Sequence, residues 1–220
     1  MIKIENINTC NWEAAIRSMR NPLNSWDKSD SEFEYQRYNS ETEDFDCFPC
    51  VKIGENDLSL MKKLVRAGSD HRKFLRQIMV SMDITAPLYW WKEFDTYKVA
   101  TVANSTSTMH KIHAKPFSRA DFSTDHMDEE TLAQFDHVIA YLELLRGKYM
   151  ENKDKRYWYD MIQFLPSSYN QMRTCTFNYE NLRNMYASRK HHKLDEWHDY
   201  CDWLEGLPYF KEICLGEGHK

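Results

Sequence analysis

The sequence predicts an α/β or α+β fold, with helices around at least one short-stranded sheet. Two patterns carry this prediction: apolar residues recur every three or four positions over residues 128–148, whereas they alternate with other residues over 74–86. The composition supplies a third observation, because 42% of the 220 residues are hydrophobic and 14% are aromatic. That is enough apolar material for one core, so residues 1–220 are expected to form a single domain.

The first part of the chain is expected to hold two helices separated by a long loop. A short helix is predicted over 12–19, and the polar segment 21–45 has the composition of an irregular connection. Asp57 is of a residue type that caps helices, so a helix is predicted over 58–67, with Gly68 placed to end it.

A strand and an aromatic helix are predicted next. The alternation over 74–86 places four apolar side chains on one face, as in a half-buried strand: Ile78, Val80, Met82 and Ile84. Pro87 marks a boundary, and a proline in the first turn suits the short aromatic helix predicted over 88–94.

The second half of the chain is expected to be mainly helical. The clearest helix is predicted over 128–148, because its apolar positions follow the helical period and acidic residues at its start complement the helix dipole. Two further helices are predicted over 157–164 and 179–189, separated by the β-favouring segment 174–177. A last amphipathic helix is predicted over 194–207.

The charge and hydropathy patterns exclude two classes of partner. The formal net charge is −5 and no contiguous basic block is present, so binding to a nucleic-acid backbone is not expected. No window approaches eighteen apolar residues and the start of the chain lacks a signal-peptide pattern, so no membrane span is expected either. These observations predict a cytoplasmic protein.

Six cysteines are scattered along the chain, and reduced thiols are expected rather than a disulfide framework. Cys47 and Cys50 stand two residues apart. This spacing is typical of half a zinc site or of a redox pair, but it also occurs at structural positions, and the sequence does not choose among these roles.

The histidines include two local pairs, at His110 and His113 and at His191 and His192. Imidazoles three residues apart share one face of a helix, where they could bind a metal. No acidic or cysteine third ligand stands at a fixed spacing, so ordinary surface histidines are favoured and no metal site is expected.

Glycine-rich phosphate loops are absent, so a bound phosphate would have to be held by side chains. The run 104–108, shortly after Lys98, offers hydroxyl and amide groups that suit a phosphate or a base edge, although a polar loop looks similar. Asn178, Asn184 and Arg189 lie on or just before one predicted helix and are expected to share one broad face. They could converge on one ligand, or form a solvated helix face.

The order of these segments resembles the flavin-dependent thymidylate synthases over residues 12–208. In that family a glycine–histidine segment precedes a strand, an Ala-Pro pair and an aromatic helix. The signature Arg-His-Arg-x-x-Ser-x-Asn-x-x-Ser-x-Arg follows. Here His71 precedes the predicted strand, Ala86-Pro87 follows it, and Asn104 and Ser107 keep the spacing of the signature.

The late part of the chain continues the resemblance. The family carries a Leu-Pro pair, an Asn twelve residues after the Pro, and then an Asn and an Arg on the next helix. Leu165-Pro166, Asn178, Asn184 and Arg189 stand at these spacings. The chain differs from the family at six positions that carry polar or basic residues there: Tyr97, Lys98, Val99, Val102, Met109 and Ile162.

The resemblance implies a mixed α/β fold with a central mixed sheet flanked by helices. It also implies a homotetramer with sites shared between subunits, and bound FAD. His71, Asn178 and Asn184 would face the flavin. The nucleotide would be bound by residues of the signature segment and of the late helix: Lys98, Asn104, Ser107 and Arg189. The implied reaction is the reductive methylation of dUMP or a related pyrimidine nucleotide, with carbon from methylenetetrahydrofolate and hydride from NADPH. No catalytic residue is assigned.

Two other classes of function stay open. The loss of basic residues from the signature favours a non-catalytic nucleotide-binding or interaction protein on the same scaffold, because charge-assisted hydrogen bonds to a phosphate are worth roughly 1.5–3 kcal/mol each. A helical α/β domain without a ligand would explain the matches as packing positions.

Overall fold

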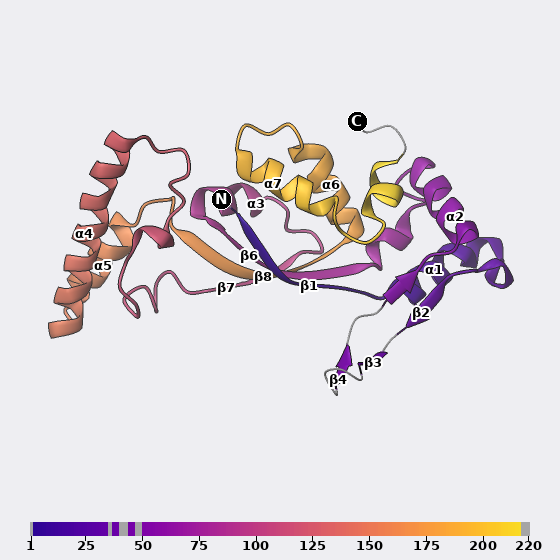
Figure 1. Ribbon diagram of the computed structural model, residues 1–220, viewed down its shortest axis with the longest axis horizontal. Helices are drawn as coiled ribbons and strands as arrows, with labels where there is room; N and C mark the ends of the chain where they lie inside the picture. The colour runs from indigo at the N-terminus through magenta and orange to yellow at the C-terminus, as the bar shows by residue number, and fades with distance from the viewer. Residues whose placement is uncertain (1, 35–36, 40–43, 47–49, 217–220) are drawn as a thin grey trace. The chain divides into compact units, whose positions relative to one another are not determined.

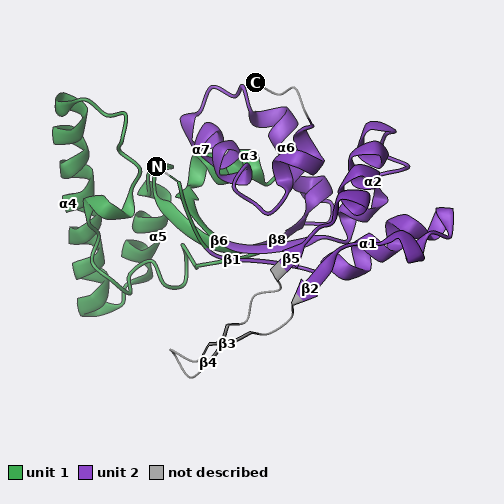
Figure 2. Ribbon diagram, turned by 45° about the vertical axis from the view of Figure 1, so that its right-hand side comes forward, with its two compact units in different colours: residues 1–5, 83–96, 103–174 green, residues 6–82, 97–102, 175–220 purple. Residues whose placement is uncertain are grey.

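The computed structural model describes residues 2–34, 37–39, 44–46 and 50–216, and the chain divides into two compact units (Figures 1 and 2). Unit 1 comprises residues 1–5, 83–96 and 103–174, and unit 2 comprises residues 6–82, 97–102 and 175–220. Helices and a sheet occur together, which confirms the predicted fold class. The single domain expected over 1–220 stays a prediction.

A four-stranded sheet has the order β1–β6–β8–β7, and each of its strands has residues in both units. Its strands are β1 (Lys3–Cys10), β6 (Met79–Pro87), β7 (Val102–Ser105) and β8 (Asn170–Asn178). Along β6, buried and half-buried residues alternate, which confirms the predicted half-buried strand. The strand begins at Met79 rather than near Phe74, because residues Lys73–Arg76 form a 3-10 turn.

Two small antiparallel pairs lie in unit 2: β2 (Glu32–Glu34) with β5 (Cys50–Lys52), and β3 (Arg37–Asn39) with β4 (Asp44–Asp46). The prediction of an irregular connection over 21–45 is therefore wrong in part. Strands of three residues are too short to show an alternating pattern in the sequence. Cys47 lies outside the described residues, so the role of Cys47 and Cys50 stays open.

Unit 1 contains α3 (Leu88–Phe94), α4 (Glu129–Asn152) and α5 (Lys155–Phe164). The last two lie side by side (Figures 1 and 2). They enclose a core of seven buried apolar residues: Ile112, Phe117, Phe122, Ile139, Leu142, Leu145 and Met161. The predicted helices 88–94, 128–148 and 157–164 are confirmed within a few residues. No helix in the described part of the chain combines the length and apolar character that crossing a membrane requires.

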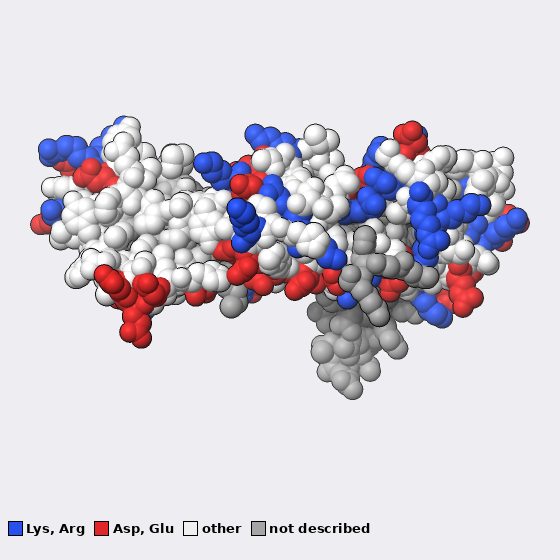
Figure 3. Space-filling model, turned by 90° about the horizontal axis from the view of Figure 1, so that it is seen from above, with Lys and Arg blue, Asp and Glu red and all other residues white. Residues whose placement is uncertain are grey.

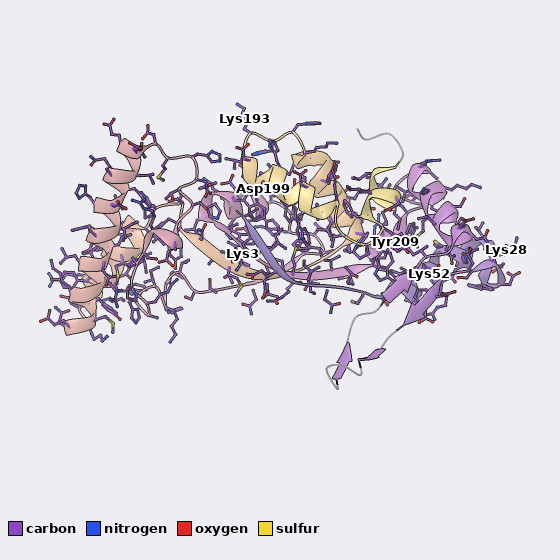
Figure 4. All side chains as sticks on the ribbon, in the orientation of Figure 1. Lys3, Lys28, Lys52, Lys193, Asp199 and Tyr209 are labelled. Atoms are coloured by element: carbon purple, nitrogen blue, oxygen red, sulfur yellow. The ribbon has the colours of Figure 1, made fainter. Side chains whose placement is uncertain are left out.

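Unit 2 contains α1 (Trp12–Arg20), α2 (Glu55–Arg66), α6 (Tyr179–Arg189) and α7 (Asp195–Leu204). Tyr179 is fully buried at their centre, with its ring centroid 5.1 Å from that of Trp12 and 5.6 Å from that of Phe210. Tyr209, labelled in Figure 4, accepts a hydrogen bond from Ile53 N–H at 3.1 Å through its hydroxyl. The C-terminal segment is thereby joined to the residues that lead into α2.

The start of α2 corrects the prediction that Asp57 caps a helix over 58–67. The helix begins at Glu55, after Gly54, and the carboxylate of Asp30 accepts the N–H groups of Asn56 and Asp57 at 2.9 and 3.1 Å. A Cβ on Gly54 would lie only 2.2 Å from Asp30 Cγ, so this approach requires glycine. The capping residue therefore comes from a segment distant in sequence.

Asp57 is instead a fully buried carboxylate. Its Oδ1 accepts from Arg20 Nε at 2.6 Å, and its Oδ2 accepts from the hydroxyls of Ser29 and Ser31 and from the N–H groups of Asp30 and Ser31. Burial alone would raise the pKa of Asp57, but these hydrogen bonds outweigh it and hold the pKa below its usual value. The group joins α1, the 29–31 loop and α2.

Replacement of Asp57 by Asn should lower the free energy of unfolding by about 3–5 kcal/mol, because it leaves the buried Arg20 guanidinium without a counter-charge. Urea unfolding at pH 7 measures the loss. The exposed Asp27→Asn is the matched control and should change stability by less than about 0.5 kcal/mol.

The same pair of variants tests the charge of Asp57 through pH. Since its pKa is lowered in the folded state, its contribution is complete above the unfolded pKa of about 3.9 and is lost as the pH falls through the lower folded value. The parent should therefore lose more stability than Asp57→Asn below about pH 4. Equal slopes in that range would show that the carboxylate is not ionised in the folded protein.

Candidate functional site

The junction between β8 and α6 positions the late site residues. Asn178 is the N-cap of α6: its Oδ1 accepts from Asn181 N–H at 2.9 Å, and Asn181 Oδ1 accepts from Asn178 N–H at 3.3 Å. The next backbone N–H, that of Tyr179, donates to Ile78 O at 3.0 Å. Asn178 is 5% exposed, and its side chain stabilises the junction between β8 and α6 through the cap hydrogen bond.

An ion pair fixes the early histidine segment to the same helix. Arg72 donates through Nε at 2.9 Å and Nη2 at 3.0 Å to the carboxylate of Glu180, and both side chains are mostly buried. His71, the preceding residue, is exposed. Two segments 108 residues apart are therefore held together, with His71 next to the residue that anchors to the first turn of α6.

Asn184 and Arg189 do not share one face of α6, which corrects the expectation from spacing. Five residues correspond to about 140° around a helix axis, and the two side chains have different surroundings. Asn184 is exposed, whereas Arg189 is half-buried. Asn178, outside the helix proper, is buried. The three side chains therefore differ in how accessible they are to a ligand, and their convergence on one ligand stays a prediction.

Arg189 packs against two aromatic rings. Its Nε donates to the hydroxyl of Tyr97 at 2.8 Å, and its guanidinium carbon lies 5.4 Å from the Tyr97 ring centroid and 4.7 Å from that of Trp197. Tyr97 stands where the family signature has its first Arg. A second cation there would repel Arg189, whereas the tyrosine stacks with it and accepts its hydrogen bond.

The rest of the signature segment is mostly exposed. Lys98 and Asn104 are exposed, and Val99 O accepts from Asn181 Nδ2 at 2.9 Å. Ala100 has a φ of 56°, a conformation that non-glycine residues rarely adopt. Ser107 is also exposed, and its Oγ accepts from His110 N–H at 2.8 Å.

The predicted site residues fall in both units. Asn104 and Ser107 belong to unit 1, whereas unit 2 holds the others: His71, Lys98, Asn178, Asn184 and Arg189. Within unit 2, Asn178, Asn184 and Arg189 belong to α6 and its N-cap, and the Arg72–Glu180 ion pair joins the segment of His71 to the same helix. Among the described residues, no group of three His, Cys, Asp or Glu side chains is arranged to hold a metal ion.

Sequence reasoning missed a group of basic residues around two neighbouring cavities of unit 2. One cavity, of about 240 Å³, is lined by Lys62, Arg66, Arg72 and Arg183 among others, and the second, of about 470 Å³, by Arg183 and Lys190. Lys and Arg side chains gather over α2 in Figure 3. The four-residue spacing of Lys62 and Arg66 on one helix face was the available signal.

The shared wall of the two cavities contains Arg183 and Cys214. Arg183 donates through Nε to Cys214 O at 3.1 Å, which fixes the guanidinium between them. Burial raises the pKa of the Cys214 thiol far above its usual range, so this cysteine is a neutral wall residue and not a nucleophile. The cavities therefore offer cationic binding groups rather than a reactive thiol.

The hydrogen bond between Asn178 Oδ1 and Asn181 N–H makes Asn178 the cap of α6. Asn178→Ala should lower the free energy of unfolding by about 1 kcal/mol, because an N-cap hydrogen bond is lost, while Asn178→Asp should retain most of the stability. Thermal unfolding without ligand measures both. Asn184→Ala, an exposed change on the same helix, is the control and should be close to neutral; an equal loss in both alanine variants would contradict the assignment.

No protein-family model matches the sequence, and no curated protein sequence matches it. Solved structures do match. A structure of thymidylate synthase X from Helicobacter pylori with FAD and dUMP aligns with a TM-score of 0.67 at 15% identity, covering 97% of this chain and 97% of that chain. A second structure of the same enzyme, flavin-dependent and complexed with FAD and dUMP, aligns with a TM-score of 0.65 at 15% identity, covering 96% and 98%. The chain therefore has the fold of the flavin-dependent thymidylate synthases.

Proposed function

We propose that this protein binds FAD and a pyrimidine nucleotide on a diverged flavin-dependent thymidylate synthase scaffold. The observation that carries the proposal is the Arg72–Glu180 ion pair, which holds the segment of His71 against the helix of Asn184 and Arg189. The shared fold supports it, since both matching structures of thymidylate synthase X contain FAD and dUMP.

The described residues fit a flavin in part. His71 and Asn184 are exposed polar side chains in unit 2 and would hydrogen-bond the flavin. Asn178 would contribute to flavin binding by positioning α6, because its carboxamide oxygen already accepts a backbone N–H. The basic side chains around the nearby cavities, Arg183 among them, suit the diphosphate of such a cofactor.

The nucleotide would be bound by Arg189, Lys98, Asn104 and Ser107. Arg189, whose Nε donates to the hydroxyl of Tyr97, would bring a positive charge to the phosphate. Lys98, exposed beside Tyr97, adds a point charge. The hydroxyl of Ser107 can still donate its proton while it accepts from the backbone.

A bound flavin supplies hydride transfer, and the protein supplies binding and orientation. In the proposed reaction dUMP or a related nucleotide is reductively methylated, with methylenetetrahydrofolate as carbon donor and NADPH as reductant. Arg189 and Lys98 would hold the phosphate and fix the pyrimidine ring. A cytoplasmic homotetramer in which subunits share the site is part of the same proposal.

The second candidate is binding without turnover. Three apolar residues are highly exposed at or near signature positions that carry polar or basic groups in the family: Val99 is 84%, Val102 69% and Met109 51% exposed. They provide neither phosphate ligands nor charge for an electron-rich uracil. Incubation with FAD, dUMP, methylenetetrahydrofolate and NADPH distinguishes the candidates, since only the first yields a methylated nucleotide.

Flavin binding is tested by the visible absorbance that co-elutes with the full chain after incubation with FAD. The parent should retain flavin and gain thermal stability, because a ligand that prefers the folded state raises the melting temperature. His71→Ala and Asn184→Ala should each weaken flavin binding about 10-fold through the loss of one hydrogen bond. The exposed Ser188→Ala on the same helix is the matched control. If the parent remains colourless after incubation with FAD and its melting temperature does not change, the proposal of flavin binding is wrong.

Nucleotide binding is tested by calorimetric titration of dUMP into parent and Arg189→Gln protein. Loss of the positive charge at this position should weaken dUMP binding at least 10-fold. The exposed Arg17→Gln is the charge-matched control and should bind as the parent does. Since Arg189 also packs on aromatic rings, the melting temperature of each variant is measured alone; a folded Arg189→Gln that binds dUMP normally removes Arg189 from the site.

A further inference from the structure

Unit 1 contains a third cavity that belongs to neither the predicted site nor the basic cavities of unit 2. It has a volume of about 390 Å³, within the range of small-molecule sites. It lies where α4 ends and α5 begins, next to the segment that follows β7. Its lining consists of cationic, imidazole and aromatic residues: His110, His113, Tyr149, Lys153, Lys155 and Trp158.

Two lysines give the cavity its charge. Lys153 ends α4 with a φ of 57°, and its Nζ lies 5.2 Å above the Tyr149 ring; Lys155 begins α5, with its Nζ 5.3 Å above the Tyr159 ring. In the described part of the chain neither forms an ion pair. Positive charge is therefore concentrated without a compensating carboxylate in the lining.

The acidic residue between the two lysines is engaged elsewhere. Asp154 Oδ2 accepts from Arg156 Nε at 3.0 Å and from Nη2 at 2.6 Å, while its Oδ1 accepts from Arg156 N–H at 3.0 Å. These bonds lower the pKa of Asp154 and keep its carboxylate as the partner of Arg156. Asp154 is therefore not the partner of either lysine, and Lys153 Nζ donates instead to the neutral sulfur of Met150 at 3.4 Å.

The aromatic wall of the cavity contains the rings of Trp158 and Tyr149. The indole N–H of Trp158 donates to Met109 O at 3.0 Å, so this side chain presents its ring to the cavity. The Tyr149 ring packs edge-to-face against the His113 ring, with ring centroids 4.8 Å apart. Such a wall suits a flat aromatic group, because stacking on an aromatic side chain needs no specific hydrogen bond.

The surroundings of His113 favour the neutral form of its imidazole. Burial, together with the charges of Lys153, Lys111 and Arg146, lowers its pKa below the usual value. Its Nδ1 is buried and finds no hydrogen-bond partner among the described residues. The imidazole therefore adds polarity to the wall without adding positive charge, and the attraction for an anion rests on the two lysines.

We propose that this cavity is a second ligand site, which binds a phosphorylated aromatic compound of mononucleotide size. The phosphate would lie between Lys153 and Lys155, and the aromatic ring would stack on Trp158. Ser107 supports the site from outside by holding the backbone N–H of His110, which gives this hydroxyl a structural role here. The proposal concerns unit 1 alone and does not depend on flavin binding.

The test is calorimetric titration of the full chain with AMP, adenosine and inorganic phosphate. AMP should bind, and each fragment should bind at least 10-fold more weakly than AMP. The double variant Lys153→Gln/Lys155→Gln should weaken AMP binding at least 10-fold, and Trp158→Phe should retain most of the affinity because a ring remains. Lys148→Gln is the matched control: this lysine also lies over a ring, that of Tyr157, but does not line the cavity.

Each alternative result overturns a named part of the proposal. AMP that fails to bind at millimolar concentration, or binds the double variant as it binds the parent, excludes the site. If adenosine binds as well as AMP, the proposed phosphate contact is excluded. If inorganic phosphate binds as well as AMP, the proposed stacking of the ring is excluded. The Lys153→Gln/Lys155→Gln variant changes no residue of the proposed flavin site and should retain FAD as the parent does, so failure here is distinguishable from failure of the proposed function.

Discussion

The ion pair between Arg72 and Glu180 is the constraint on which the candidate site depends. It is bidentate, it is mostly buried, and it joins positions 108 residues apart. A buried charge left without its partner costs about 3–5 kcal/mol, so the two segments separate only at a cost comparable to a large part of a domain's stability. The exposed His71 therefore has a fixed neighbour, which a flexible surface histidine would lack.

The helix anchored by this pair, α6, has buried and exposed positions within eleven residues. Its first turn is occupied by the Asn178 cap and the buried Tyr179, which are satisfied within the protein. Asn184 is exposed, and Arg189 near the end is held by Tyr97 and Trp197. Spacing alone gives Asn178, Asn184 and Arg189 similar roles. The structure shows that Asn178 caps the helix, whereas Asn184 is exposed on it.

Local patterns predicted most of the elements, whereas contacts between distant segments could not be predicted. The aromatic helix α3 and the late helix α6 have the predicted bounds, and the alternation in β6 reports which side chains are buried. Asp57 shows the limit. Its residue type and position suggest a helix cap, but Asp30 supplies the cap and Asp57 is drawn into a buried network with Arg20. Which of two aspartates caps a helix depends on tertiary approach, and a single sequence does not contain that information.

The fold of this chain matches that of the two thymidylate synthase X structures. The positions of its Lys and Arg side chains do not follow from the fold alone. Core packing tolerates extensive apolar substitution when volume and pattern are kept, so a fold can persist at 15% identity while a binding site changes. In the segment after α3, Tyr97 accepts a hydrogen bond from Arg189, and the exposed Val99 adds no charge. Uncompensated cations are found instead in the cavity lined by Lys153 and Lys155, and further basic side chains line the cavities around Arg183. Because positive charge in a cavity attracts anions, binding of anionic ligands should be tested first at these cavities.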